Sequence, residues 1–453
     1  MQSATGKAQG VLVLSHVGFS FLEDLVEVLD ARSLASYVLS SLPLPEHQLD
    51  RPREMREKAD DVRIVPRHEL TEKDVEAYLA DLRERGEDVV ACVSVWEGYR
   101  HLMAHANAAL GVPDLDPKQV LTLRDKLTVR NRLADAGLTR SRAAELTRES
   151  LAAHQGLKRR QFVKPVSGIA SYGAFPLSPG TTWDDIERIV REAGGDTVYA
   201  SAFGDDGLTF LVEDYVEGRE FSFEVIADDG AVSVVAVHEK CEVTEAADTV
   251  LENACVSPPR GVGQDDLARG LSWVREVLAH FELRWGCFHI EARHDGRHWD
   301  LIEINPRVGG ALISHSVREL TGQAGMLDLW MDALLAGAGG LSQRAAFRDR
   351  LAALAYAQDG STPARTATFF RVFFAEKGRI EHIGPREDLP LRPTVTHVLL
   401  KAGDVVDAAA REVFLGQLLW SFPREESTAH LAELARTSAH ALDVRYADAT
   451  PDL

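Results

Sequence analysis

The sequence predicts an α/β protein in which a doubly wound N-terminal domain precedes an α+β region built on antiparallel strands. Two observations lead to this fold class. Residues 1–112 alternate apolar strand-like runs with helical repeats, which is typical of a parallel sheet covered by helices. Beyond residue 200, strand-like runs follow one another with short turns between them, which favours antiparallel pairing.

Composition limits the classes of function. The chain has 453 residues, of which 45% are hydrophobic and 26% are charged, an ordinary globular balance. Its net charge of -20, without any Lys/Arg-rich run, argues against a nucleic-acid partner. No apolar run is long enough for a membrane span, and the polar opening residues do not resemble a signal peptide. The four cysteines form no CxxC pair, so we expect reduced thiols in a cytoplasmic protein.

The N-terminal region reads as alternating strands and helices. We expect strands at 11–15, 62–66 and 88–96, with helices at 21–30 and 72–86. Gly18 alone is too weak for a dinucleotide-binding fingerprint. Glu97 ends a strand, where α/β sheets bind ligands, but we interpret it as a solvated end residue.

Two lysines stand out in the middle of the chain. Residues 121–138 predict one amphipathic helix that carries Lys126 and ends at Gly137. The segment "QFVKP" predicts a short strand that holds Lys164 at its end. The small-residue loop that follows, 167–173, would let backbone N–H groups approach an anion. It is not a Walker A loop because Ala and Phe follow it, and no kinase HRD or DFG element is present.

A run of strands follows these lysines. We expect strands at 209–216, 221–227 and 232–240 in one antiparallel unit, joined by turns at 217–220 and 228–230. Glu213 and Glu220 flank the first turn, and Lys240 lies at the far end of the third strand.

The segment 285–307 predicts two strands around an Asp-Gly turn, and it offers a metal site. Alternation places His289 and Glu291 on one face, and Leu301, Glu303 and Asn305 on one face of the return strand, opposed by Ile302 and Ile304. If the strands pair in register, Glu291 and Glu303 lie side by side and repel unless a cation or a proton separates them. Carboxylate and amide oxygens suit Mg²⁺ or Mn²⁺, and Arg307 then follows as a phosphate-matching cation.

Two other interpretations of this segment are weaker. A structural Glu–Arg pair would explain neither Glu291 nor the glycines that follow Arg307. A zinc site could use His289, His294 and His298, but two of these flank the turn.

The motifs "RDK", "FVKP", "LVEDYVEGRE" and "HIEA…LIEINPR", in this order, resemble the ATP-grasp superfamily over roughly residues 90–335. The tail contains "RVFFAEKGRIEHIG", read as a β-hairpin, and is similar to the carboxylate–amine ligase branch, such as L-amino acid ligases. The resemblance implies a Rossmann-like domain over 1–112, a small lid lobe over 113–200 and a large lobe with a C-terminal extension over 201–453.

The resemblance also implies residue roles. Lys126 and Lys164 would contact ATP phosphates, and the loop 167–173 would cover them through Ser167, Gly168, Ser171 and Gly173. The adenine edge would meet Glu213, Tyr215 and Val216, and the ribose would meet Glu220. Mg²⁺ would bind Glu291, Glu303 and Asn305, while Arg307 and Lys240 would steady the transferred phosphate.

The resulting hypothesis is an ATP-dependent ligase, expected to be a homodimer, that joins a small carboxylate to an amine through an acyl phosphate. Such chemistry needs charge neutralisation and positioning rather than a protein nucleophile, which fits a sequence without a GxSxG motif. Two alternatives stay open: an ATP-dependent carboxylase that uses bicarbonate, and a non-catalytic nucleotide-binding protein.

Overall fold

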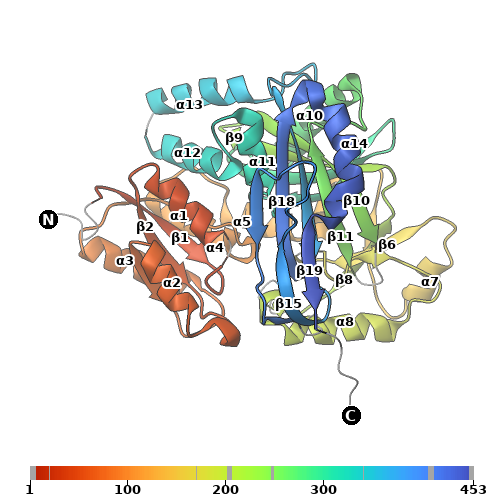
Figure 1. Ribbon diagram of the computed structural model, residues 1–453, viewed down its shortest axis with the longest axis horizontal. Helices are drawn as coiled ribbons and strands as arrows, with labels where there is room; N and C mark the ends of the chain where they lie inside the picture. Colours follow the sequence, from red (N-terminus) through yellow and green to blue (C-terminus); the bar gives the residue numbers. More distant parts are fainter. Residues whose placement is uncertain are drawn as a thin grey trace, which may run out of the picture.

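The computed structural model of the protein describes residues 7–19, 21–169, 171–200, 207–245, 249–339, 341–406 and 413–447. The strands in these ranges form a parallel sheet, a large and a small antiparallel sheet, and a short C-terminal sheet (Figure 1). This is the predicted mixed α/β architecture. Within these ranges, no helix combines the length and the apolar character of a membrane span.

The N-terminal sheet is parallel, as predicted. Its order is β3-β2-β1-β4, with β1 at Gly10–Ser15, β2 at Ala35–Ser40, β3 at Asp61–Ile64 and β4 at Val89–Val93. Every residue of β1 and β2 is buried, which explains their continuous apolar runs. The helices and 3₁₀ turns around it are α1 (Leu22–Asp30), η1 (Pro45–His47), α2 (Arg51–Lys58), α3 (Glu72–Glu84), η2 (Glu97–Tyr99) and α4 (Arg100–Leu110).

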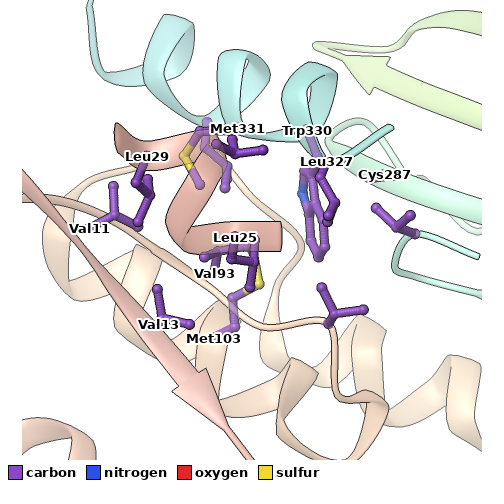
Figure 2. Close-up of a cluster of buried hydrophobic side chains, with 14 of the residues drawn as sticks. Val11, Val13, Leu25, Leu29, Val93, Met103, Cys287, Leu327, Trp330 and Met331 are labelled. Carbon is purple, nitrogen blue, oxygen red and sulfur yellow. The ribbon is translucent and has the colours of Figure 1, made fainter. Parts of the chain in front are cut away.

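The core of this domain continues into the rest of the chain. Figure 2 shows Leu25 and Leu29 of α1 beside Leu327 and Met331 of a later helix, α12 (Met326–Ala338). These side chains belong to one buried cluster that also includes Cys287. The N-terminal sheet is therefore packed firmly against the lobe that follows, which fixes the position of the C-terminal end of β4.

The linker to the small sheet differs from the prediction. Two helices, α5 (Pro117–Arg124) and α6 (Lys126–Asp135), replace the single helix expected over 121–138. Asp125 separates them because its side chain accepts a hydrogen bond from Thr128 N, 2.9 Å away, and so caps α6. Lys126 therefore begins a helix instead of lying within one.

The small sheet has the order β5-β8-β6-β7. Its elements are β5 (Ala143–Glu145), α7 (Leu151–Gln155), β6 (Gln161–Pro165), β7 (Phe175–Pro176), α8 (Trp183–Gly195), α9 (Thr197–Ala200) and β8 (Phe210–Asp214). The single antiparallel unit expected over 209–240 is wrong, because β8 pairs in this sheet while β9 belongs to the large one. The chain between β8 and β9 thus crosses from one sheet to the other.

The large sheet has the order β13-β12-β9-β10-β11-β14-β18-β16. Its strands are β9 (Arg219–Asp228), β10 (Ala231–Glu245), β11 (Val250–Ser257), β12 (Gly286–His294), β13 (Trp299–Asn305), β14 (Thr366–Phe374), β16 (Val395–Val398) and β18 (Phe414–Pro423). The predicted hairpin around Asp229 and Gly230 is confirmed, with Gly230 at a φ of 83°. Lys240 lies inside β10 instead of at its end, because β10 continues to Glu245.

The helices of this lobe are α10 (Gln264–His280), α11 (Ile313–Thr321), α12, α13 (Leu341–Leu354) and α14 (Ser427–Thr437), with 3₁₀ turns η3 (Arg424–Glu426) and η4 (Ser438–His440). The hairpin expected from "RVFFAEKGRIEHIG" is wrong. Its first strand, β14, pairs with β11 and β18, whereas β15 (Gly378–Pro385) pairs with β17 (Val405–Val406) and β19 (Leu442–Tyr446). Local alternation predicted both strands but could not assign their partners.

Candidate active site

The pairing of β12 with β13 forms the floor of the candidate site. Glu291 is paired with Glu303, and His289 with Asn305, so the predicted register is confirmed. The next pair is Ala292 with Leu301, so a β-bulge leaves Ile302 as the extra residue. Leu301 therefore turns into the hydrophobic core, and the prediction that it shares a face with Glu303 is wrong.

The bulge has a partner in the neighbouring elements. Arg130 of α6 donates to the carbonyl of Leu301 through Nη1, and its Nη2 lies 3.3 Å from the carbonyl oxygen of Ile302. Lys164 Nζ donates to the same Ile302 oxygen at 3.1 Å. Backbone oxygens that leave the ladder at a bulge need other donors. Here they tie the carboxylate-bearing strand to the linker helix and to the small sheet.

Each metal-ligand candidate lies beside a cation or a second carboxylate. Lys240 Nζ is 2.7 Å from Glu291 Oε1, and Lys126 Nζ is 3.0 Å from Glu303 Oε1. With the Asn305 amide oriented to satisfy its hydrogen bonds, its nitrogen lies 3.2 Å from both Glu303 Oε1 and Glu97 Oε2. Burial by itself would lower the pKa of Lys126, but nearby carboxylates, chiefly Glu303, raise it.

These residues fit a divalent cation by the chemistry of their donors. The hydrogen bonds that Glu291 accepts from Lys240 and His289 both end on Oε1, so Oε2 lies outside those contacts. Two carboxylates from paired strands and one amide can supply the few protein oxygens that Mg²⁺ takes beside phosphate oxygens. Among the described residues, no group of three or more His, Cys, Asp or Glu side chains is arranged as a metal site. The fit thus depends on the amide and on further oxygens from a ligand.

Lys240 is surrounded by three carboxylates. Its Nζ lies 2.8 Å from Glu220 Oε1 and 2.7 Å from Glu291 Oε1, and it also contacts Glu252 of β11. Burial alone would lower the pKa of Lys240, but these carboxylates raise it well above its usual value. Lys240 therefore keeps its charge beside Glu291.

The expected adenine and ribose residues are held in ion pairs. Arg130 Nε lies 2.6 Å from Glu213 Oε2, and Lys164 Nζ lies 2.7 Å from its Oε1. Glu220 is shared by Lys240 and by Arg293, whose Nε lies 2.8 Å from Oε2. Burial would raise the pKa of Glu213, but the charges of Arg130 and Lys164 outweigh burial and lower it. Burial also lowers the pKa of Lys164, although Glu213 opposes this.

The segment between β8 and β9 is fixed by its own contacts. The Tyr215 hydroxyl donates to Glu245, and the Arg160 guanidinium stacks 3.7 Å from the centre of the Tyr215 ring. Arg293 Nη1 donates to the Val216 carbonyl at 2.9 Å. Held in this way, the segment could present its backbone groups to the flat adenine ring. The predicted contact with adenine therefore concerns the backbone of this segment more than the Glu213 side chain, which is held in ion pairs.

The small-residue loop lies against Lys126. Lys126 N donates to Val166 O at 3.1 Å, and Lys126 Nζ donates to Gly168 O at 3.1 Å. Ser167 Oγ lies 3.3 Å from Arg124 O. A Cβ on Gly168 would lie only 2.9 Å from Pro165 Cβ, so this position has no room for a side chain. Ser171 and Gly173 both have positive φ, and residue 170 lies outside the described residues.

Glu97 is a residue that the sequence interpretation misjudged. Instead of a solvated end residue, it is buried, and Arg307 Nη2 lies 3.0 Å from its Oε2. Arg100, on the same segment, donates from Nε to Pro306 O at 2.8 Å. The N-terminal domain therefore contacts the segment around Arg307 directly.

The three histidines of the zinc interpretation do not converge. His289 lies between Glu224 and Glu291, whereas the His294 ring stacks on Trp299 at 4.7 Å. The Glu224 carboxylate, with Glu291, overcomes burial and raises the pKa of His289 to about 10. Burial would raise the pKa of Glu224, but His289 and His238 lower it to about 2.

Several of these residues were missed in the sequence. Arg130 lies four residues after Lys126, a spacing that puts both side chains on one face of a helix. Ser222 and Glu224 follow the predicted Glu220 at alternate positions of β9, which places three polar side chains on one face of the strand. Both patterns are visible in the sequence. The approach of Glu252 to Lys240 depends on which strands are neighbours in the sheet, which the sequence pattern does not reveal.

Comparisons with known proteins bear on the fold of the chain. A family model described as an ATP-grasp domain matches residues 159–315. The chain is similar to L-amino acid ligase from Bacillus licheniformis, with a TM-score of 0.72 and 18% identity, covering 98% of this chain and 100% of that chain. No curated protein sequence matches the chain.

Other solved structures share the fold. Phosphoribosylglycinamide synthetase from Anaerococcus prevotii has a TM-score of 0.63 and 12% identity, covering 97% of this chain and 100% of that chain. Biotin carboxylase from Campylobacter jejuni has a TM-score of 0.62 and 13% identity, covering 96% of this chain and 92% of that chain. The chain therefore has the ATP-grasp fold, and the match to the family model lies within residues 159–315.

Proposed function

We propose that this protein is an ATP-dependent ligase that joins a small carboxylate, such as an amino acid, to an amine. The observation that carries the proposal is the Glu291–Glu303 pair on adjacent strands, with Asn305 and Arg307 following on the same chain. Lys126 contacts Glu303, and Lys164 contacts the backbone of the same strand at Ile302, so two further cations lie near the oxygens that would bind the metal. The similarity in fold to an L-amino acid ligase, over nearly the whole of both chains, supports the same assignment.

The nucleotide would lie between the small sheet and the β12–β13 floor. Lys126 and Lys164 now contact Gly168 O, Glu303, Glu213 and Ile302 O, and phosphate oxygens would take over some of these contacts. The loop 167–173 would cover the phosphates, the backbone of Glu213–Val216 would meet the adenine, and Glu220 would meet the ribose. Glu291, Glu303 and Asn305 would hold Mg²⁺, which neutralises phosphate charge when it is bound.

The reaction needs positioning more than a protein nucleophile. A carboxylate oxygen of the acid attacks the γ-phosphorus, and ADP leaves. The amine then attacks the acyl carbon, loses a proton, and expels phosphate that retains one oxygen of the acid. Arg307, oriented by Glu97, would hold the oxygens of the transferred phosphate through its planar fork, and Lys240 would add a fixed positive charge.

A carboxylase is the alternative, because biotin carboxylase shares this fold and the same metal site would activate bicarbonate. Release of ADP should be measured against a panel of acids and amines, with and without bicarbonate. ADP release that requires both an acid and an amine supports the ligase. Release that requires bicarbonate and no amine supports the carboxylase, and binding without turnover supports a nucleotide sensor.

The four free cysteines support the expected cytoplasmic location.

A further inference from the structure

His289 occupies a position that the proposed reaction does not yet use. Its ring lies between two carboxylates: Nε2 is 3.2 Å from Glu291 Oε1, and Nδ1 is 2.9 Å and 3.0 Å from the two oxygens of Glu224. His289 precedes Glu291 by two residues on β12, so both side chains emerge from the same face of the strand. The imidazole therefore contacts the proposed metal ligand from within the protein.

Glu224 holds the ring from behind. Its exposed fraction is 0%, and Ser222 Oγ donates to its Oε1 at 2.8 Å. Because this carboxylate is buried, its contacts with His289, Ser222 and His238, whose Nδ1 lies 3.5 Å from Oε1, determine where it points. A buried carboxylate that accepts from both sides fixes the plane of the imidazole, as outer carboxylates fix histidines around metal sites in general.

The segment after Arg307 packs on the same ring. A Cβ on Gly309 would lie 2.6 Å from His289 Nδ1 and 2.9 Å from its Cε1. No positive φ requires glycine at this position; what excludes a side chain is the lack of space, first against the imidazole and then against Ile313 Cγ1, which a Cβ would approach to 3.0 Å. A Cβ on the neighbouring Gly310 would meet nothing within 4 Å. The close approach is thus specific to the residue that touches His289.

We propose that His289 is a positioning residue that aligns Glu291 for the metal and sets the height of the Arg307–Gly309 backbone above the site. The same ring thus contacts both parts of the proposed site: Glu291, which would bind the metal, and the segment that carries Arg307, which would bind phosphate. This inference rests on the proposed function, because it assumes that Glu291 binds a metal together with a nucleotide.

The test measures metal binding without turnover. Mn²⁺ binding in the presence of ADP is followed by electron paramagnetic resonance for the wild type, His289→Ala, Gly309→Ala, Gly310→Ala and the double variant His289→Ala/Gly309→Ala. Affinity for ADP without metal and the thermal unfolding midpoint are measured alongside. Loss of outer partners of metal ligands typically costs about 10- to 100-fold in metal affinity. We expect about that loss for His289→Ala, with little change in metal-free ADP affinity.

Gly309→Ala should weaken Mn²⁺ binding in the same direction, since the added methyl displaces the ring, while Gly310→Ala should match the wild type. The double variant should be no worse than His289→Ala, because removal of the ring makes room for the methyl. Wild-type Mn²⁺ affinity in both His289→Ala and Gly309→Ala would overturn the proposal, and so would additive losses in the double variant. A loss of metal-free ADP affinity as large as the loss of Mn²⁺ affinity would also overturn it. If His289→Ala does not fold, the Gly309 and Gly310 variants decide it. A wild type that binds ADP but no Mn²⁺ would overturn the metal site and the proposed function with it.

Discussion

Replacing Lys164 by methionine tests the proposed nucleotide site at a largely buried cation. Lys164 Nζ lies 2.7 Å from Glu213 Oε1 and 3.1 Å from Ile302 O, and its side chain is 9% exposed. Methionine keeps most of the length of the side chain and removes the charge and the donors. Arg130 Nε stays 2.6 Å from Glu213, so the substitution does not leave the carboxylate without a cation.

Two magnitudes follow from this geometry. A buried charge left alone costs about 3–5 kcal/mol, but because Arg130 remains we expect the free energy of unfolding to fall by only about 1–2 kcal/mol. A hydrogen bond to a charged phosphate contributes about 1.5–3 kcal/mol. Since 1.4 kcal/mol is about tenfold in affinity, ATP binding should weaken by roughly 10- to 150-fold.

Calorimetry with ATP and with adenosine measures this directly. The loss should be large for ATP and small for adenosine, because the missing contact is to phosphate. Lys158→Met serves as the matched control, since Lys158 is an exposed lysine of the same lobe and the charge change is identical. Wild-type ATP affinity in a folded Lys164→Met protein, or equal losses for ATP and adenosine, would refute the placement of phosphates beside Lys164.

The other predictions concern the metal, the arginine and pH. Glu303→Gln should keep the fold and lose most activity, and Glu291→Gln should do the same less severely; activity that survives both changes, or EDTA, would remove the Mg²⁺ argument. Arg307→Lys should lower turnover by about 10²-fold or more with little change in ATP affinity, because lysine lacks the planar fork. Glu97→Gln should lower turnover in the same way by releasing Arg307. Unchanged turnover in steady-state kinetics would contradict both expectations. Burial, with His397 and Arg318 nearby, lowers the pKa of His315 to about 4. As the pH falls, this histidine is therefore protonated in the unfolded chain before it is protonated in the folded protein. The free energy of unfolding should fall by up to about 3 kcal/mol as the pH drops from about 6.5 to about 4. Urea unfolding across this range should show a flatter dependence for His315→Asn, and an equal slope would contradict it. Light scattering should give the mass of a homodimer; a monomer would contradict that expectation.

The floor of the site could be predicted because its information is local. Alternation along β12 and β13 places acid and amide groups on the same faces, and a short turn leaves one plausible register for Glu291 and Glu303. The bulge at Ile302 was not predictable in this way. It is compensated by donors from Arg130 and Lys164, which lie on elements remote in sequence.

The errors in the fold have the same origin. The helical repeat runs through Asp125 without interruption, so the sequence pattern does not reveal the break, which comes from the extended backbone at Asp125 and from the cap that its side chain forms on α6. Strand periodicity is the same whichever sheet a strand joins, so it could not separate β8 from β9 or β14 from β15. Glu97 was misjudged because its burial comes from Arg307, more than two hundred residues away in the chain.

The transfer of oxygen from the acid to phosphate tests the central claim most directly. The acid found in the substrate panel is labelled with ¹⁸O in its carboxylate and incubated with ATP, Mg²⁺ and the amine, and the phosphate is analysed by mass spectrometry. An acyl phosphate intermediate predicts one labelled oxygen in each inorganic phosphate released with ADP. Label found in AMP, or inorganic phosphate without label, would contradict the proposed reaction.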